Sequence, residues 1–132
     1  MWIVKCGGET FVNIYAPSGT ANRKERWELL NELSVHILSM EKDKLPVMAG
    51  DWNVILAECD TTRYFQTKYC NVLDRVVKSF SYQDFFRYLH PGAWEYTFHR
   101  GEHVAQSRLD RVYVPSPPGH QPAVCQTQAR DQ

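Results

Sequence analysis

A short apolar run that ends in an acid and an amide places the strongest constraint on how this 132-residue chain folds. Residues 45–49 read Leu-Pro-Val-Met-Ala, and the next four residues read Gly-Asp-Trp-Asn. A short apolar run of this kind predicts a buried strand. Asp51 and Asn53 lie two residues apart, so in an extended segment their side chains point to the same side. We therefore predict that both side chains converge at the carboxyl end of a strand, where α/β sheets tend to hold ligands.

This pair of side chains has two interpretations. A carboxylate beside an amide suits orienting a water or a metal ion while donating a hydrogen bond to an anionic oxygen. The alternative is an Asx turn, in which both side chains cap local backbone. Residues 50–53 alone favour the turn, and two other segments shift the balance toward a functional site.

The first of these segments covers residues 11–19. Alternation places Val12 and Ile14 on one face of a strand and Asn13 and Tyr15 on the other, and a proline and a glycine end the strand. Tyr15 then sits at a strand mouth with its hydroxyl available to a ligand. The alternative is a tyrosine that packs on the sheet with a solvated tip.

The second segment, residues 106–114, is rich in β-branched and aromatic residues and predicts a strand. The alternation places Asp110 on the same face as Val112 and Val114, which we expect to be the core face. An acid there is unfavourable unless it is paired or hydrogen-bonded. Asp110 is therefore either a functional carboxylate or half of a buried ion pair with Arg108 or another arginine.

The N-terminal half also predicts a hairpin and a long helix. Residues 2–5 and 10–15 form the hairpin around a Gly-Gly turn. Residues 23–40 form an amphipathic helix with a capping box of Asn22 and Glu25. The residues expected to face the core from this helix are Trp27, Leu30, Leu33 or Ser34, and Ile37.

The C-terminal half predicts shorter elements. Residues 54–67 have no period and indicate a loop, residues 69–79 a helix, and Asp84 the cap of a helical turn that ends at Leu89. The helix is expected to bury Leu73, Val76, Val77 and Phe80. Strands near 95–99 and 106–114 form a hairpin.

Size and composition fit a single α/β domain with a real core. We predict that this domain covers residues 1–114 and that the proline-rich residues 115–132 form a disordered tail. No apolar run approaches the length of a membrane span, so no membrane association is expected. The four cysteines lack Cys-x-x-Cys spacing, which disfavours zinc and favours a reducing intracellular compartment.

Charge is balanced overall but not along the chain. The net formal charge is zero, which by itself gives no support to nucleic-acid binding. Residues 1–60 carry nine acidic and six basic side chains, whereas residues 61–112 carry five acidic and eight basic ones. An acidic half beside a basic half would suit a polyanionic substrate, although an imbalance of this size is weak evidence.

Five motifs in order resemble the endonuclease/exonuclease/phosphatase superfamily. They are the Tyr-Ala-Pro strand end at Tyr15, residues 50–53, residues 84–91 (Asp-Phe-Phe-Arg-Tyr-Leu-His-Pro), residues 96–98 (Tyr-Thr-Phe) and residues 107–111 (Ser-Arg-Leu-Asp-Arg). Each motif alone is unspecific, but their order and spacing over about residues 10 to 114 are similar to the family. The Ser-Arg-Leu-Asp-Arg form resembles the endonuclease domain of LINE-type (non-LTR) retrotransposons.

The resemblance implies a partial four-layer α/β sandwich of two mixed sheets flanked by helices. In that family a metal-binding glutamate precedes the Tyr-Ala-Pro strand, and a Ser-Asp-His strand comes last. Neither has a counterpart here, so we expect the N-terminal strands and the C-terminal strand to be missing. The implied cofactor is Mg²⁺, and no residue of this chain is assigned to bind it, because the family glutamate has no counterpart here.

By the same resemblance, Asp51 would orient the attacking water and Asn53 would donate to a phosphate oxygen. Tyr15 would contact the phosphate or the leaving oxygen, and Asp110 would orient the missing histidine. Arg100, Ser107 and Arg108 are the expected substrate contacts, with the last two near a DNA-facing rim.

The expected function is that of a fragment of a metal-dependent DNA phosphodiesterase that nicks target DNA for reverse transcription. The implied partners are DNA and the reverse transcriptase domain of the same polyprotein, and the implied location is the nucleus. We expect the isolated chain to be inactive. The alternatives are a non-catalytic remnant with at most weak DNA binding and a phosphatase or phospholipase of the same superfamily.

Overall fold

The computed structural model describes residues 1–62, 70–101 and 105–116. Within these residues, seven strands form two sheets, and several helices accompany them. The five strands of the main sheet stand in the order β1-β2-β3-β7-β4. Their bounds are β1 Trp2–Cys6, β2 Glu9–Tyr15, β3 Val47–Asp51, β4 Tyr82–Asp84 and β7 Asp110–Pro115. The second sheet pairs β5 (Phe98–Arg100) with β6 (Ala105–Ser107). These two sheets with their helices confirm the predicted α/β fold class, and the second sheet is a two-stranded antiparallel ladder within the described residues.

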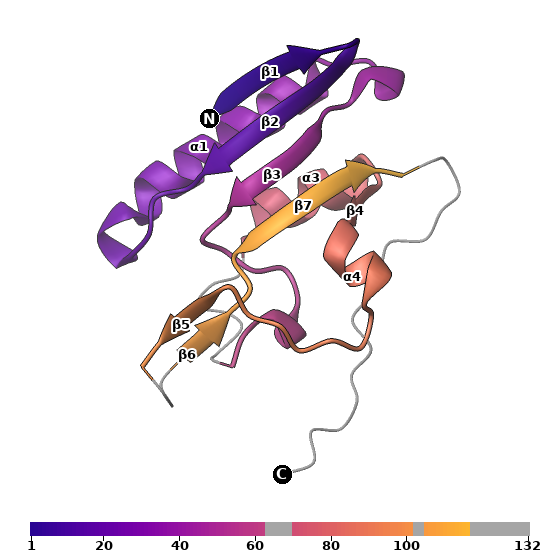
Figure 1. Ribbon diagram of the computed structural model, residues 1–132. Coiled ribbons are helices and arrows are strands. Elements are labelled where there is room, and N and C mark those ends of the chain that lie inside the picture. Colours follow the sequence, from indigo (N-terminus) through magenta and orange to yellow (C-terminus); the bar gives the residue numbers. More distant parts are fainter. Residues whose placement is uncertain (63–69, 102–104, 117–132) are drawn as a thin grey trace.

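The main sheet is mixed because β2 and β3 run parallel while its other neighbouring strands run antiparallel. Parallel neighbours need a crossover, and α1 (Arg23–Leu38) supplies it between β2 and β3. In Figure 1, α1 and α3 (Asn71–Ser79) lie together on one face of this sheet. The β1–β2 hairpin and the strands near 10–15 and 45–49 are thus confirmed, although β3 begins and ends two residues later than predicted.

The core lies between the main sheet and these two helices. Val12 and Ile14 of β2 and Met48 of β3 are buried there, as the alternation predicts. The helix residues that meet them are Leu30, Leu33, Ile37, Leu73 and Val76, with Val77 and Phe80 partly buried against the cluster. Among the described residues, no helix is both long and apolar enough to cross a membrane.

Two details of α1 differ from the sequence prediction. Trp27 is 51% exposed, because the stripe that meets the sheet begins only at Leu30. The capping box is also wrong, since the Asn22 side chain makes no cap hydrogen bond to the helix. Its Nδ2 instead donates to the Ser18 carbonyl at 2.9 Å, where it holds a short 3₁₀ turn (Thr20–Asn22) that leads into the helix.

The segment after β3 contains two further short helices and a strand. A 3₁₀ turn at Glu58–Asp60 lies inside the predicted loop, much of which falls outside the described residues. Strand β4, which the sequence analysis missed, precedes α4 (Phe85–Leu89). Asp84 caps α4 as predicted, because its Oδ1 accepts the Arg87 backbone N–H at 3.2 Å. Another 3₁₀ turn, Lys42–Lys44, precedes β3.

The predicted strand 106–114 is divided into β6 and β7, and its faces are reversed. The chain leaves the second sheet after Ser107 and enters the main sheet at Asp110. Arg111 and Tyr113 face the interior, whereas Asp110 and Val112 are exposed. The prediction of a core-facing Asp110 is therefore wrong. This register buries the large ring of Tyr113 against Trp52 at 5.2 Å between ring centroids and leaves the carboxylate in water, which avoids desolvating a charge.

The predicted domain boundary at 114 lies close to the end of β7 at Pro115. Ser116 still donates its backbone N–H to the Ser81 carbonyl at 2.9 Å. Residues 117–132, which hold most of the predicted disordered tail, lie outside the described residues.

Gly50 is the glycine on which the packing of β3 against β2 depends. Its φ is +138°, and an added Cβ would lie 1.9 Å from the Ile14 carbonyl oxygen. We expect Gly50→Ala to destabilise the fold by roughly 3 kcal/mol, because strain and a backbone clash act together. Urea denaturation measures the loss. Gly92→Ala is the control, because its Cβ would meet nothing within 4 Å, and equal losses in the two variants would contradict this account.

Candidate functional site

The carboxyl ends of β2 and β3 and the amino end of β7 lie side by side in the main sheet and bring three of the predicted site residues together. Tyr15 is the register partner of Asp51 across the parallel β2–β3 pair. Asp51 is in turn the register partner of Asp110 across the antiparallel β3–β7 pair. Residues that are distant in sequence therefore lie side by side on neighbouring strands.

Asn53 joins this group through the turn that follows β3. Its backbone N–H donates to Asp51 Oδ1 at 3.0 Å, so the Asx turn is present. Its side-chain Nδ2 donates to the Ala16 carbonyl, which ties the turn to the end of β2. Asn53 adopts a left-handed φ of 50°, which asparagine tolerates better than most residues.

The turn and a ligand-binding role are compatible. An amide carries two N–H groups and a carboxylate two oxygens, so each side chain keeps hydrogen-bonding capacity after making its turn contact. Tyr15 is 72% exposed, which leaves its hydroxyl open to a ligand. The site thus offers acceptors from Asp51 and Asp110 and donors from Tyr15 and Asn53.

The environment of Asp51 disfavours its charged form. Partial burial raises the pKa of this carboxyl above its ordinary value, and the nearby charge of Asp110 raises it further. The hydrogen bond from the Asn53 N–H and the positive charge of Arg111 lower it, but not enough to cancel the rise. A carboxyl with a raised pKa beside a second acid is a common feature of functional sites.

Trp52 joins the end of β3 to the start of β7, a role that the sequence analysis missed. Its backbone N–H donates to the Leu109 carbonyl at 3.0 Å, and its indole Nε1 donates to the Arg111 carbonyl at 3.2 Å. The ring is fully buried. The available signal was its position between two polar residues of a strand end, which points an aromatic ring to the opposite, core side.

Arg108 and Ser107 are interior residues, so their predicted place on a DNA-facing rim is wrong. Arg108 is 2% exposed and Ser107 is 0% exposed. Ser107 Oγ lies 3.0 Å from Thr61 Oγ1. Both side chains belong to the buried boundary between the two sheets and cannot reach a substrate on the surface.

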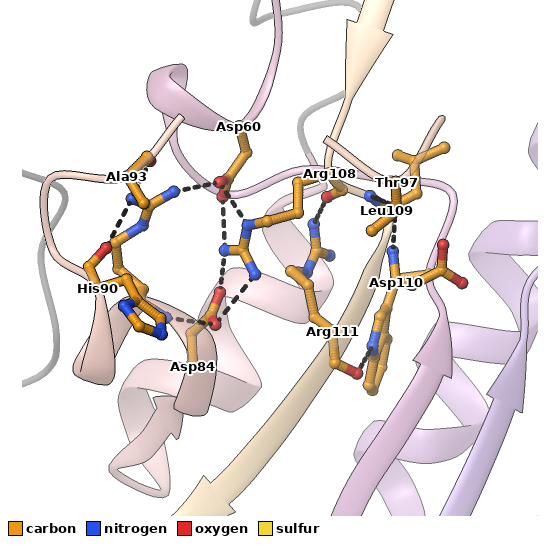
Figure 2. Close-up of polar contacts among 11 residues, drawn as sticks. Asp60, Asp84, His90, Ala93, Thr97, Arg108, Leu109, Asp110 and Arg111 are labelled. Atoms are coloured by element: carbon orange, nitrogen blue, oxygen red, sulfur yellow. Dashed lines mark hydrogen bonds and ion pairs between the residues drawn. The ribbon is translucent and has the colours of Figure 1, made fainter. Parts of the chain in front are cut away.

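Arg108 instead joins an ion cluster with Asp60, Asp84 and Arg87 (Figure 2). Its Nε lies 2.8 Å from Asp60 Oδ1, and its Nη2 contacts Asp84 Oδ2. Burial alone would lower the pKa of Arg108, but hydrogen bonds and the charges of both acids outweigh it and raise the pKa. The predicted alternative for Asp110, a buried ion pair with an arginine, is therefore wrong for the described residues, because Arg108 pairs with Asp60 and Asp84 and Asp110 is exposed.

The last predicted substrate residue, Arg100, ends β5 and is exposed. It is accessible to a polyanion, and its role stays a prediction.

A cavity of about 450 Å³ adjoins the strand ends on the side of α4. Its lining includes apolar side chains such as Phe85, Phe86 and Val112 as well as polar ones such as Thr97 and Asp110. Most of the lining surface is apolar, so the cavity suits apolar groups better than phosphate.

The described residues do not form a complete metal site. They contain no group of three or more histidine, cysteine, aspartate or glutamate side chains that could hold an ion. Mg²⁺ prefers octahedral oxygen coordination and uses one or two carboxylates together with substrate phosphates and water. The facing carboxylates of Asp51 and Asp110 have the right chemistry, but further ligands would be required.

The ion cluster predicts an unequal response to losing a cation. We expect Arg108→Met to destabilise the chain by about 3–5 kcal/mol, because it removes the arginine partner of Asp84 and leaves the buried Asp60 paired with Arg87 alone. The control is Lys78→Met, since the Lys78 side chain is 71% exposed in its pair with Asp74 and should contribute at most about 1 kcal/mol. Chemical denaturation compares the two variants, and similar losses would argue against a structural role for Arg108.

The raised pKa of Asp51 predicts a pH-dependent gain in stability on neutralisation. A carboxyl whose pKa is higher in the folded state favours folding when protonated, so its charge opposes folding above that pKa. We expect Asp51→Asn to raise the melting temperature near neutral pH. The gain should shrink as the pH falls through the raised pKa toward the ordinary value of 3.8. Thermal melts across this range test it, with the exposed Asp43→Asn as control, and a gain independent of pH would contradict the assignment.

Comparison with known proteins gives a likeness in sequence and likenesses in structure. The chain is 30% identical over 118 residues to the "Transposon TX1 uncharacterized 149 kDa protein" of Xenopus laevis. This match covers 86% of the chain but 9% of the relative, so the chain spans a small part of that protein. No family model matches the chain.

The structural comparison concerns the fold. The structure of an AP endonuclease from Archaeoglobus fulgidus superposes with a TM-score of 0.64 at 19% identity, over 84% of this chain and 50% of that one. The sequence relative is a transposon protein and the structural neighbour has an endonuclease fold, as the five motifs predicted. Together these likenesses confirm the resemblance that the five motifs predicted, to a part of a LINE-type endonuclease domain.

Proposed function

We propose that this chain is part of a metal-dependent DNA phosphodiesterase that nicks target DNA for retrotransposition. The observation that carries the proposal is the register of β2, β3 and β7, which sets Tyr15, Asp51 and Asp110 side by side with Asn53 next to them. The sequence likeness to a transposon protein and the AP-endonuclease fold support a nuclease-type function. DNA is then the substrate, and a reverse transcriptase domain of the same polyprotein and the nucleus are the corresponding partner and location.

Each side chain has a role that its position allows. The Asp51 carboxylate accepts a hydrogen bond from the attacking water and orients it toward phosphorus. The Asn53 N–H that does not contact Ala16 donates to a non-bridging oxygen, whose charge grows in the transition state. The exposed Tyr15 hydroxyl contacts the phosphate or the leaving oxygen. Asp110 accepts from, and thereby orients, an imidazole supplied by other polypeptide.

The cofactor of this proposal is Mg²⁺, which when bound neutralises charge on the scissile phosphate. The facing carboxylates of Asp51 and Asp110 would supply part of its oxygen coordination. We also propose that the isolated chain is inactive, as the resemblance implies. Arg100, exposed at the end of β5, is the proposed contact to the DNA backbone.

A nicking assay on supercoiled plasmid tests the proposal. The purified 132-residue chain should show little or no Mg²⁺-dependent nicking. A fusion that adds the early strands and the Ser-Asp-His strand of a related endonuclease should nick, and a chelator should stop it. In this fusion, Asp51→Ala should reduce nicking about 100-fold or more, because residues of one catalytic unit depend on each other.

The control in the fusion is Asp43→Ala, an exposed acid on a 3₁₀ turn that precedes β3. Strong chelator-sensitive nicking by the unfused chain would overturn the claim of inactivity. A fusion that is indifferent to Asp51→Ala would overturn the site. Hydrolysis of phosphomonoesters or phospholipids without nicking would favour the alternative substrates of the superfamily.

A further inference from the structure

Residues 108–110 form the turn through which the chain enters the main sheet, and most of their backbone N–H and carbonyl groups make hydrogen bonds. The Arg108 N–H donates to the Asp60 carbonyl at 2.8 Å, and the Arg108 carbonyl accepts from Arg111 Nη1 at 3.1 Å. The Leu109 carbonyl accepts from the Trp52 N–H at 3.0 Å. Two donors of this turn remain, the N–H groups of Leu109 and Asp110.

Both of these donors point to one atom, the hydroxyl oxygen of Thr97 (Figure 2). The distances are 3.0 Å from the Leu109 nitrogen and 3.1 Å from the Asp110 nitrogen. A hydroxyl oxygen has two lone pairs, so it can accept both hydrogen bonds at once. Thr97 is itself anchored, because its backbone N–H donates to the Ser107 carbonyl at 3.1 Å.

These contacts define the direction of the Asp110 side chain. Its carboxylate leaves the backbone at the residue whose N–H is fixed by Thr97 and whose strand partner is Asp51. No described residue forms an ion pair with that carboxylate, so its placement rests on the backbone. A rotation of the peptide between Leu109 and Asp110 would move the carboxylate away from Asp51.

We propose that Thr97 is a positioning residue that sets the Asp110 carboxylate beside Asp51. The inference rests on the proposed function for its consequence in catalysis, but the contact stands on the geometry alone. Thr97 is exposed, so water can replace its hydroxyl with little loss of stability. Its removal should therefore affect the position of Asp110 more than the folding of the chain.

The first test uses the chain itself and compares Thr97→Val with Thr97→Ser. Valine keeps the shape and removes the acceptor, whereas serine keeps the acceptor. Amide exchange at Leu109 and Asp110 should speed up roughly tenfold in Thr97→Val and stay near wild type in Thr97→Ser. Thr20→Val, on the 3₁₀ turn before α1, is the matched control.

A second readout on the same variants reports the carboxylate. The charge of Asp110 raises the pKa of Asp51, so a displaced Asp110 should lower the pKa of Asp51 in a carbon-13 NMR titration. Asp110→Asn sets the full size of that change. Exchange and titration curves of Thr97→Val that match the wild type would overturn the inference.

The third readout uses the nicking fusion and separates this inference from the proposed function. Thr97→Val should lower kcat about tenfold with KM unchanged, and Thr97→Ser should restore it. If Asp51→Ala stops nicking but Thr97→Val does not slow it, Thr97 has no positioning role while the proposed function holds. If the fusion never nicks, the proposed function fails, and the exchange and titration data alone decide whether Thr97 positions Asp110.

Discussion

The buried guanidinium of Arg108, held between two carboxylates, joins the parts of the structure that sequence order keeps apart. It links the 3₁₀ turn at Asp60, the cap of α4 at Asp84 and the passage from β6 to β7. Arg87 adds a second cation, so two acids and two bases share the cluster. Without this neutralisation each buried charge would be strongly unfavourable, so the cluster forms completely or the local fold fails.

The position of the site follows from this arrangement. Because Arg108 is fixed, the chain turns at Leu109 and enters the main sheet at Asp110 opposite Asp51. Trp52 stabilises this pairing by donating hydrogen bonds to the carbonyls of Leu109 and Arg111, one on each side of Asp110. The strand ends are thus set by buried groups, and the polar side chains of the site add the Asx turn and the contact of Asn53 with the Ala16 carbonyl.

Much of the fold could be predicted from local patterns, because local patterns produce it. The strands at 10–15 and 45–49 and the inner face of α1 follow from alternation and helical spacing, which act over a few residues. The partners of Arg108 could not be found this way, since Asp60 lies 48 residues and Asp84 lies 24 residues away. Asp60 stands in a segment without period, so nothing local marks it as buried.

The reversed face of β7 has a similar cause. Alternation determines which residues share a face, but a break in the strand resets which face is inner. The break at residues 108–109 depends on the Arg108 cluster and on Thr97, neither of which the strand pattern contains. The proximity of Tyr15, Asp51 and Asp110 could nevertheless be predicted, because each stands at a strand end regardless of the face that the strand buries.

Four aspartates around the strand ends divide into two groups according to whether an arginine neutralises their charge. Asp60 and Asp84 are deeply or largely buried and are paired with arginines at short range. Asp51 and Asp110 face each other across neighbouring strands, and no described residue forms an ion pair with either. Like charges directly opposite in a sheet are destabilising, and the charge of Asp110 adds to the partial burial that raises the pKa of Asp51. Arg108 makes its hydrogen bonds within its cluster, and Arg111, whose charge lowers the pKa of Asp51 in part, donates to the Arg108 carbonyl. The carboxylates at the strand ends therefore remain available to a positively charged ligand. A cation or a protonated imidazole beside a phosphate would neutralise them.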